Sequence, residues 1–344
     1  CSPAGVVRDS KFFLNAKNIH AVVNTEVTAI DRKNKRIEFT NLLTGEKGSD
    51  SYDKLIITTG ASPRKPPVPG IELEGVTTLH SLLDADYLRQ IRDKGEIKKA
   101  VVIGGGLIGI ETCEALHLAG IEITIIELLP QLLTFLDKQM ARLVEKYLQT
   151  KANVILKNGV TAFLGENGKL TAVKLQNGTE IPCELAVVAI GVSPNIKLAQ
   201  DAGIKIGHAG GIKVNEYMQT NDPDIYAAGD CVEIPNLITG ESVLAPYGDL
   251  ANLEGRVAGE NVIMGNVARF PGTIQTGICK VFDYGVGSTG LSEQNALQQG
   301  FDTIETVVNA SLDKPGFMQG KLLITKLVVN KTTGNILGAQ VIGP

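Results

Sequence analysis

The spacing of hydrophobic residues predicts a block of alternating strands and helices between residues 99 and 156. Short apolar runs at 99–103, 123–127 and 153–156 are typical of buried strands. The segments between them, 107–118 and 137–149, are long enough for helices, and the second repeats its apolar residues at intervals of three and four. The order β-α-β-α-β predicts parallel strands with right-handed crossovers, as in a doubly wound α/β domain.

Residues before this block are predicted to be rich in strands. Short extended or alternating runs fill 20–60, and a buried strand over 54–60 ends at a glycine. Four prolines in 62–70 predict an extended connector, and 84–94 has the pattern of a helix.

Residues after the block are predicted to change character twice. Strands separated by glycine turns come first, then loops and short elements from 191 to about 268, and finally an antiparallel α+β segment with a turn at 331–335. The expected strands are 162–164, 170–176, 184–190, 306–310, 322–330 and 336–342.

Length and composition limit the possible classes of protein. The 344 residues, 43% hydrophobic and 20% charged, predict two or three globular domains. A net charge of −4, the lack of tryptophan and the lack of a Lys/Arg cluster argue against nucleic acid as a partner. No apolar run has membrane-spanning length, so we expect no membrane association. The five cysteines are widely spaced, which predicts no metal site and a cytoplasmic location.

The richest motif is the glycine turn after the first strand of the block, where 101–109 reads V-V-I-G-G-G-L-I-G. Gly104 permits a tight turn, Gly106 lets a pyrophosphate approach the backbone, and Gly109 lets the helix pack on the strand. Leu107 and Ile108 begin the helix, whose N-terminal N–H groups attract phosphate. The motif therefore predicts a dinucleotide site, although the alternative of a glycine turn that binds nothing stays open.

A carboxylate at the end of the second strand refines the predicted ligand. Glu127 follows Gly109 by eighteen residues, where an acidic side chain accepts hydrogen bonds from the adenosine ribose. It would repel a 2′-phosphate, and Leu128 and Leu129 offer no compensating charge. NAD(H) is therefore favoured over NADP(H).

Four segments, in order, resemble the pyridine nucleotide–disulfide oxidoreductases. The similarity is nearest to the branch of CoA-disulfide reductases, NADH oxidases, NADH peroxidases and persulfide reductases. It implies a doubly wound NAD-binding domain inserted in an FAD-binding domain, followed by a partial α+β dimerisation domain. The segments are 52–63, 101–111, 189–195 and 220–231. The implied domains are 1–80 and 195–268 for FAD, 81–194 for NAD(H) and 269–344 for dimerisation.

The resemblance also implies roles for individual residues. Glu111 matches a catalytic residue beside the nicotinamide and flavin, and Gly191 and Val192 match the loop that closes over NADH. The residues matched to FAD contacts are Val27, Thr59, Gly60, Ala61, Gly229, Asp230, Gly248 and Ala251.

Simpler interpretations of three of these residues remain open. Asp230 could cap a helix. Gly60 could only end a strand. Glu111 could be a carboxylate favoured by the helix dipole.

Two parts of the family pattern are not found. No second glycine fingerprint, with the redox cysteine that follows it in the family, precedes residue 99. The chain also begins with Cys1, and its dimerisation domain is shorter than that of the family, so we expect a chain truncated at both ends. Cys1 is not predicted to be the redox residue, and Cys113, Cys183 and Cys231 are predicted to be structural.

The predicted function is an FAD-dependent enzyme that passes hydride from NADH to flavin. The electrons would then reach a small acceptor, which could be a thiol or disulfide, a persulfide, a peroxide or O₂, and the full-length protein would be a homodimer. Two alternatives stay open. One is a non-catalytic nucleotide-binding fragment, and the other is a flavin reductase that donates electrons to a carrier protein.

Overall fold

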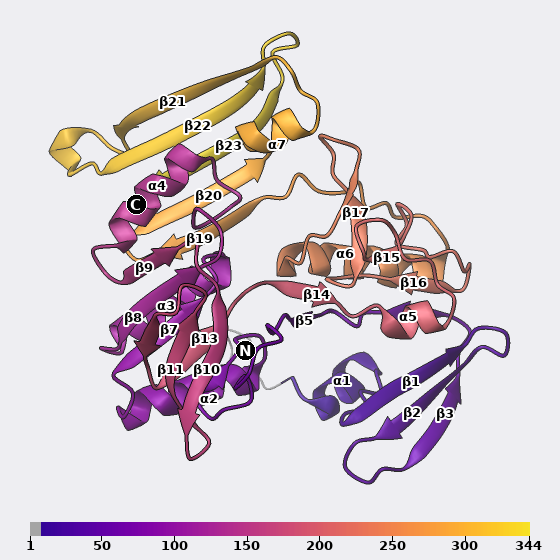
Figure 1. Ribbon diagram of the computed structural model, residues 1–344. Helices are drawn as coiled ribbons and strands as arrows, with labels where there is room; N and C mark the ends of the chain where they lie inside the picture. Colours follow the sequence, from indigo (N-terminus) through magenta and orange to yellow (C-terminus); the bar gives the residue numbers. More distant parts are fainter. Residues whose placement is uncertain (1–7) are drawn as a thin grey trace. The chain divides into compact units, whose positions relative to one another are not determined.

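The computed structural model describes residues 8–344, which form two compact units (Figure 1). Both units are discontinuous in sequence. The first contains the chain up to Gly60 together with Pro194–Ile234 and Ser242–Pro271. The second contains Ala61–Ser193, Pro235–Glu241 and Gly272–Pro344. The boundaries of the four predicted segments stay a prediction.

The first unit combines three small sheets with three helices. One sheet is an antiparallel meander, one is a parallel pair of β4 and β16, and the third has the order β15-β17-β18. Its core combines buried residues of the parallel pair with others from β1, α5, β15, β17 and α6. The strands are β1 (Thr25–Asp31), β2 (Arg36–Asn41), β3 (Lys47–Ser51), β4 (Leu55–Ile57), β15 (Ile212–Lys213), β16 (Ile225–Ala227), β17 (Val232–Pro235) and β18 (Ser242–Val243). The helices are α1 (Ser10–Lys17), α5 (Lys197–Asp201) and α6 (Gly248–Met264).

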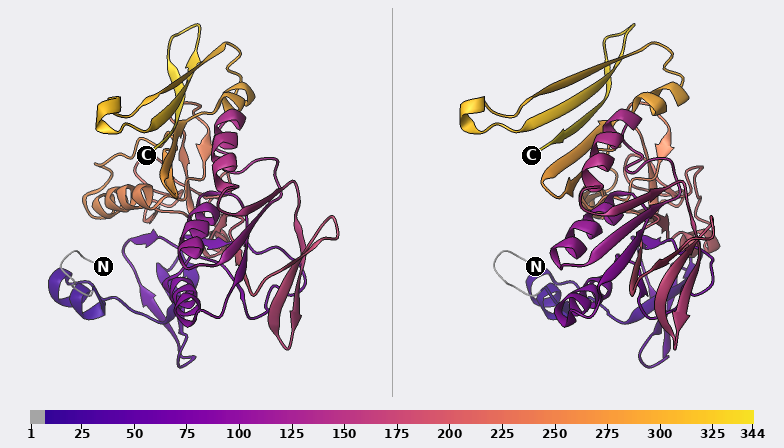
Figure 2. Two further views of the ribbon diagram at one scale, coloured as in Figure 1. Left: turned by 90° about the vertical axis from the view of Figure 1, so that its left-hand side faces the viewer. Right: turned by 60° about the vertical axis from the view of Figure 1, so that its left-hand side comes forward.

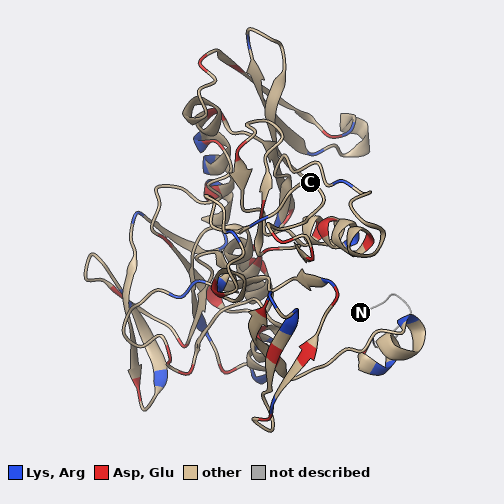
Figure 3. Ribbon diagram, turned by 90° about the vertical axis from the view of Figure 1, so that its right-hand side faces the viewer, with Lys and Arg blue, Asp and Glu red and all other residues tan. Residues whose placement is uncertain are grey.

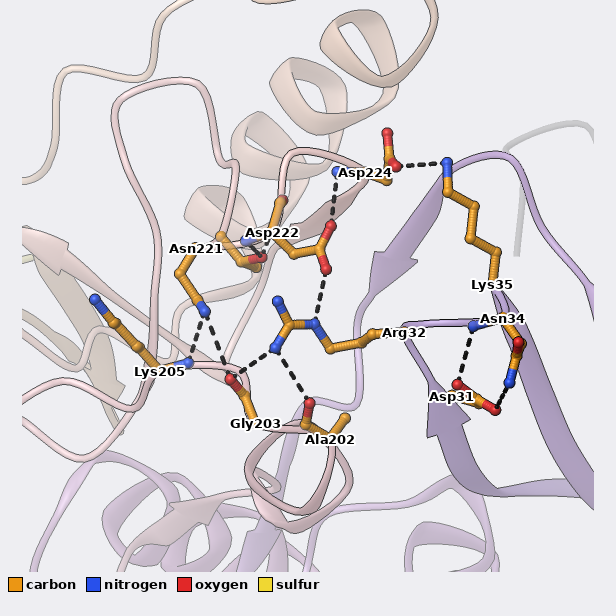
Figure 4. Close-up of polar contacts among 11 residues, drawn as sticks. Asp31, Arg32, Asn34, Lys35, Ala202, Gly203, Lys205, Asn221, Asp222 and Asp224 are labelled. Carbon is orange, nitrogen blue, oxygen red and sulfur yellow. Dashed lines mark hydrogen bonds and ion pairs between the residues drawn. The ribbon is translucent and has the colours of Figure 1, made fainter.

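Polar contacts hold the β1–β2 hairpin against the segments that surround β16 (Figure 4). Arg32 donates from Nε to Asp222 at 2.7 Å and from Nη1 to the Gly203 carbonyl at 3.0 Å. Asp224 forms ion pairs with Lys35 and Lys54. These contacts join residues that are distant in sequence, and the Lys54–Asp224 pair fixes the start of the short β4–β16 pair.

Two helices of the first unit were not predicted from hydrophobic spacing. One of them is α1, which Asp9 caps by accepting from Phe12 N at 2.8 Å. Helix α6 has seventeen residues where loops and short elements were expected. Its buried face consists of Glu254, Ala258 and Asn261, so it carries no large apolar stripe to detect.

The second unit is centred on a five-stranded parallel sheet in the order β6-β13-β7-β8-β9 (Figure 1). The predicted strands and helices of the 99–156 block are found within one or two residues of their expected bounds, and the strands are parallel as predicted. The strands are β6 (Val76–Thr77), β7 (Lys99–Ile103), β8 (Glu122–Glu127), β9 (Asn153–Leu156) and β13 (Leu185–Val188). The helices are α2 (Leu82–Lys94), α3 (Leu107–Leu118) and α4 (Lys138–Leu148). Two short strands, β5 (Ala61–Pro63) and β14 (Val192–Pro194), pair beside it.

Alternate residues of the parallel sheet face two different cores. Val102 and Ile125 pack with α3 and α4, whereas Val101 and Ile103 pack with an antiparallel sheet. All the helices that contact the sheet therefore lie on one face, because the antiparallel sheet covers the other. Its strands are β10 (Val160–Glu166), β11 (Lys169–Leu175) and β12 (Glu180–Pro182).

A second antiparallel sheet, in the order β19-β20-β23-β22-β21, ends the chain (Figure 2). The three predicted strands and their connecting turn are present, but two further strands were missed. The second of these, β20, has the sequence Y-G-V-G-S-T-G, whose glycines lack the side chains that signal a strand. The elements are β19 (Gly277–Val281), β20 (Tyr284–Gly290), α7 (Glu293–Gln298), β21 (Ile304–Leu312), the 3₁₀ helix η1 (Gly316–Met318), β22 (Leu322–Asn330) and β23 (Ile336–Gly343).

Candidate functional site

The glycine turn has the geometry that the sequence predicted. Gly104 has φ +109°, and a Cβ on Gly109 would collide with the Gly104 carbonyl oxygen, so α3 can pack against β7 only through a glycine. Gly106 is the N-cap of α3, with no side-chain cap and with open space where a Cβ would point. The free N–H groups of the first turn therefore face a region that a bound anion can reach.

Glu127 lies at this turn and supports it directly. One carboxylate oxygen accepts from Gly105 N at 2.6 Å and the other accepts from Leu129 N at 2.8 Å. The side chain therefore braces the loop as well as offering its remaining lone pairs to a ligand. Its contact with a ribose stays a prediction.

A cavity of about 520 Å³ opens beside the glycine turn, a size typical of cofactor sites. Gly104, Gly106, Glu127 and Gly191 line it, as the sequence analysis expected of nucleotide contacts. Leu107, Ile108, Gly109 and Val192 do not line it. The sequence analysis missed the other wall, which comes from Leu128, Leu129, Thr134, Asn158, Gly159, Val160 and Gln176.

Glu111 lies one turn further along α3 and outside the cavity lining. Its Oε1 is 3.4 Å from Lys280 N, at the edge of hydrogen bonding. The next acid on this helix face, Glu114, pairs with Lys280 Nζ at 2.6 Å and accepts from Phe282 N at 3.1 Å. Glu114 thus holds α3 against β19, whereas Glu111 is exposed. The catalytic role of Glu111 stays a prediction.

Four of the predicted flavin contacts lie in the first unit, after β16 and in the first turn of α6. Gly229 has φ +85° and follows β16, and its ideal Cβ position is 3.6 Å from the Cβ of Ala251. Gly248 is the first residue of α6, which has no side-chain cap. Asp230 precedes strand β17, so it does not cap a helix, contrary to the simpler interpretation.

The remaining predicted contacts are distributed between both units. Thr59 donates its hydroxyl to the Asn195 carbonyl at 2.6 Å, and Gly60, with φ +65°, accepts from Asn195 N at 2.9 Å. Gly60 therefore does more than end a strand, because its carbonyl anchors the returning chain. Val27 lies in β1, and Ala61 begins β5 in the second unit. Their contacts with FAD stay predictions.

Glu254 is a functional candidate that the sequence analysis missed. It is 2% exposed, and its Oε2 accepts from Gly229 N at 2.7 Å. Burial raises the pKa of Glu254 to about 7, and the nearby Asp230 adds to the rise. No sequence signal marked it, because a glutamate in a polar helix is usually exposed.

The four described cysteines, Cys113, Cys183, Cys231 and Cys279, are buried and free. Burial raises the pKa of Cys113, Cys183 and Cys279 to about 12, and it also raises that of Cys231. The structural role predicted for three of them agrees with this burial, whereas Cys1 lies outside the described residues. We therefore expect none of the four to act as a thiolate.

This inertness can be tested with a thiol reagent. Iodoacetamide added to the folded protein at pH 7.5, followed by peptide mass spectrometry, is expected to leave all four cysteines unmodified. The same treatment in guanidinium chloride should label each of them, which provides the control. Rapid native labelling of Cys231 would contradict the expectation.

Among residues 8–344, no group of His, Cys, Asp and Glu is arranged to hold a metal ion. None of the helices in this range is long and apolar enough to cross a membrane. Figure 3 shows acidic and basic residues together on the same elements, α6 among them.

The parallel sheet and glycine turn of the second unit, together with the glycine positions of the first unit, define a nucleotide-binding oxidoreductase fold. The sequence model of the pyridine nucleotide-disulphide oxidoreductase family matches residues 5–242, and that of the family's dimerisation domain matches residues 276–344. The chain therefore belongs to the pyridine nucleotide-disulphide oxidoreductase family.

Individual relatives agree with this assignment. The chain is 35% identical to the NADH oxidase of Methanocaldococcus jannaschii over 95% of its own length and 72% of the relative. It is 36% identical to the NAD(P)H coenzyme A polysulfide/persulfide reductase of Pyrococcus horikoshii, over 96% of the chain and 73% of the relative. The solved NAD-dependent persulfide reductase from A. fulgidus superimposes with a TM-score of 0.94 at 42% identity, over 98% of this chain. The chain spans 62% of that structure's length.

These findings confirm several predictions at the level of the family. The mixed α/β fold, the family and its dependence on FAD and NAD(H) are as the sequence analysis expected. The chain also carries the dimerisation domain of the family. The individual site residues stay predictions.

Proposed function

We propose that this protein is an FAD-dependent NADH oxidoreductase. The observation that carries the proposal is the cavity beside Gly104–Gly106, which combines an uncapped helix N-terminus with an acidic side chain. The residues present fit a dinucleotide, because Gly106 leaves open the space that a Cβ would occupy. Membership of an FAD- and NAD(H)-dependent family supports the same conclusion.

Residues of the first unit fit a flavin nucleotide in a similar way. Gly248 starts α6 with free N–H groups, and the turn at Gly229 brings Asp230 to the end of β16. In our proposal, the carboxylate of Asp230 accepts hydrogen bonds from the ribityl chain, while Glu254 holds the turn from behind. When bound, FAD supplies the ring that accepts hydride from NADH and releases electrons to the acceptor.

For the acceptor, we favour the sulfur–sulfur bond of a persulfide, polysulfide or disulfide. Two relatives carry persulfide reductase in their names, and they align with almost the whole chain. Oxygen is the second candidate, because another relative is called an NADH oxidase. We also propose a homodimer, which the dimerisation domain supports, and a reducing cytoplasmic location, which the four free thiols support.

Anaerobic reduction of the flavin tests the proposed function. NADH added to the flavin-loaded protein is expected to bleach the visible flavin absorption, and later addition of a polysulfide or of O₂ should restore it at different rates. A spectrum unchanged by NADH would overturn the proposal. A colourless protein that still binds NADH would instead favour a non-catalytic nucleotide-binding chain, and activity only with an added carrier protein would favour a flavin reductase.

The choice of nucleotide gives a separate prediction. Because Glu127 would repel a 2′-phosphate, we expect kcat/KM to be at least about tenfold higher for NADH than for NADPH. Steady-state kinetics with both nucleotides at one ionic strength measures the ratio. Equal values would contradict the role assigned to Glu127.

A further inference from the structure

A buried polar cluster lies in the second unit where α4 begins. It consists of the buried residues Asp137, Lys326 and Gln340 together with Glu293, whose side chain is 42% exposed, and is here called the Asp137 cluster. The Lys326 side chain is 0% exposed, and its Nζ is 2.8 Å from Asp137 Oδ2 and 2.7 Å from Glu293 Oε2. Gln340 donates to Asp137 Oδ2 at 2.8 Å and accepts from Asp137 N at 2.9 Å. A buried charge this well paired demands a fixed geometry.

Asp137 does not perform the role that its position suggests. It is the N-cap of α4, where an aspartate usually accepts from the N–H groups of its own helix, yet it makes no such bond. Its Oδ2 instead accepts from Lys326, from Gln340 and from Glu293 N at 3.2 Å. The Asp137 side chain therefore bonds to β22, β23 and α7 instead of capping α4. Helix α4 lies alongside these C-terminal elements in Figures 1 and 2.

The loop that ends at Asp137 forms part of the nucleotide cavity. Leu128, Leu129 and Thr134 of this loop line the cavity. Leu133 N donates to the Gly105 carbonyl at 2.8 Å, and Leu136 N donates to the Leu133 carbonyl at 2.9 Å. The loop is therefore bonded to the glycine turn at its middle, through Leu133, and joins the Asp137 cluster at its C-terminal end.

We propose that Lys326 and Gln340 are positioning residues for NADH, because they hold the 128–137 loop against the glycine turn through Asp137. This inference rests on the proposed function, since it assumes that the cavity binds the nucleotide. Neither residue touches the cavity. Their effect is to keep its wall in the binding geometry before the ligand arrives, which spares the cost of ordering a loop on binding. The sheet that carries the dimerisation match thereby sets the affinity of the nucleotide site.

Two variants test the proposal, Lys326→Met and Gln340→Leu. NAD⁺ serves as the probe because it does not reduce flavin, and calorimetry measures its Kd. We expect Kd for NAD⁺ and KM for NADH to rise about three- to tenfold with little change in kcat. Lys321→Met, an exposed lysine just before β22, is the matched control and should leave both values unchanged.

A third variant separates positioning from folding. Asp137→Asn with Lys326→Met removes both buried charges, so its Tm should recover relative to Lys326→Met, while its affinity for NAD⁺ stays weak. Hydrogen exchange without nucleotide adds an independent readout, in which residues 128–136 should exchange faster in every cluster variant. If Lys326→Met does not fold, the other two variants decide the question.

Three results would overturn the inference in different ways. Folded variants with wild-type Kd and wild-type exchange would show that the cluster is structural only. Wild-type protein that does not bind NAD⁺ would remove the proposed function itself. If residues 128–136 exchange no faster in the variants than in the wild type, and the wild type binds NAD⁺, the positioning role is wrong but the proposed function stands.

Discussion

Gly106→Asp is expected to abolish binding of NADH and to leave the protein folded. Gly106 has φ −82° and ψ −173°, which any residue adopts, and a Cβ there meets no other atom within 4 Å. Aspartate is a favoured N-cap, so the substitution should stabilise α3 by up to about 1 kcal/mol. The same carboxylate would occupy the site of the pyrophosphate and repel its negative charge, so Kd for NADH should rise at least about 100-fold.

Gly109→Ala is the matched comparison within the same motif. Its Cβ would collide with the backbone carbonyl of Gly104, which cannot move without distorting the turn. We therefore expect a fall in Tm of roughly 5–10 °C together with the loss of binding. Thermal unfolding and NAD⁺ calorimetry on both variants distinguish the two effects. Tight NAD⁺ binding by folded Gly106→Asp would contradict the assignment of this turn to the dinucleotide.

Glu254→Gln is expected to flatten the dependence of stability on pH. Glu254 has a pKa of about 7 in the folded protein against an ordinary value of 4.5. Between these values the folded protein binds one more proton than the unfolded chain, so the free energy of unfolding falls as the pH rises. The total loss from this group is up to about 3 kcal/mol, complete above pH 7. Glutamine keeps an acceptor for Gly229 N and carries no charge at any pH.

Urea unfolding of the two proteins at pH 5, 6, 7 and 8 measures this difference. The variant should be close to the wild type at pH 5, where the glutamate of the folded protein is protonated and the loss has only begun, and should be more stable at pH 8. Glu260→Gln, an exposed position on the same helix, is the control and should follow the wild-type profile. Parallel profiles for wild type and Glu254→Gln would mean that Glu254 does not titrate in this range.

Much of the second unit could be predicted because its signals are local. The strand at 99–103, the turn at 104–106 and the helix at 107–118 each follow from neighbouring residues, since glycine spacing and apolar periodicity act over a few positions. The first unit was harder to predict. Helix α6 packs through small and polar residues and has no strong periodic signal, whereas the strand expected over 54–60 is present as β4 but has only three residues.

The parallel strands, the glycine turn with Glu127 at its edge, and the family could all be predicted, because each depends on short motifs in a set order. The burial of Glu254 against Gly229 and the bonds from Asp137 to Lys326 and Gln340 are visible only in the folded chain. Those contacts join residues 25 to 203 positions apart, and no local sequence pattern predicts which polar side chains will be buried against one another.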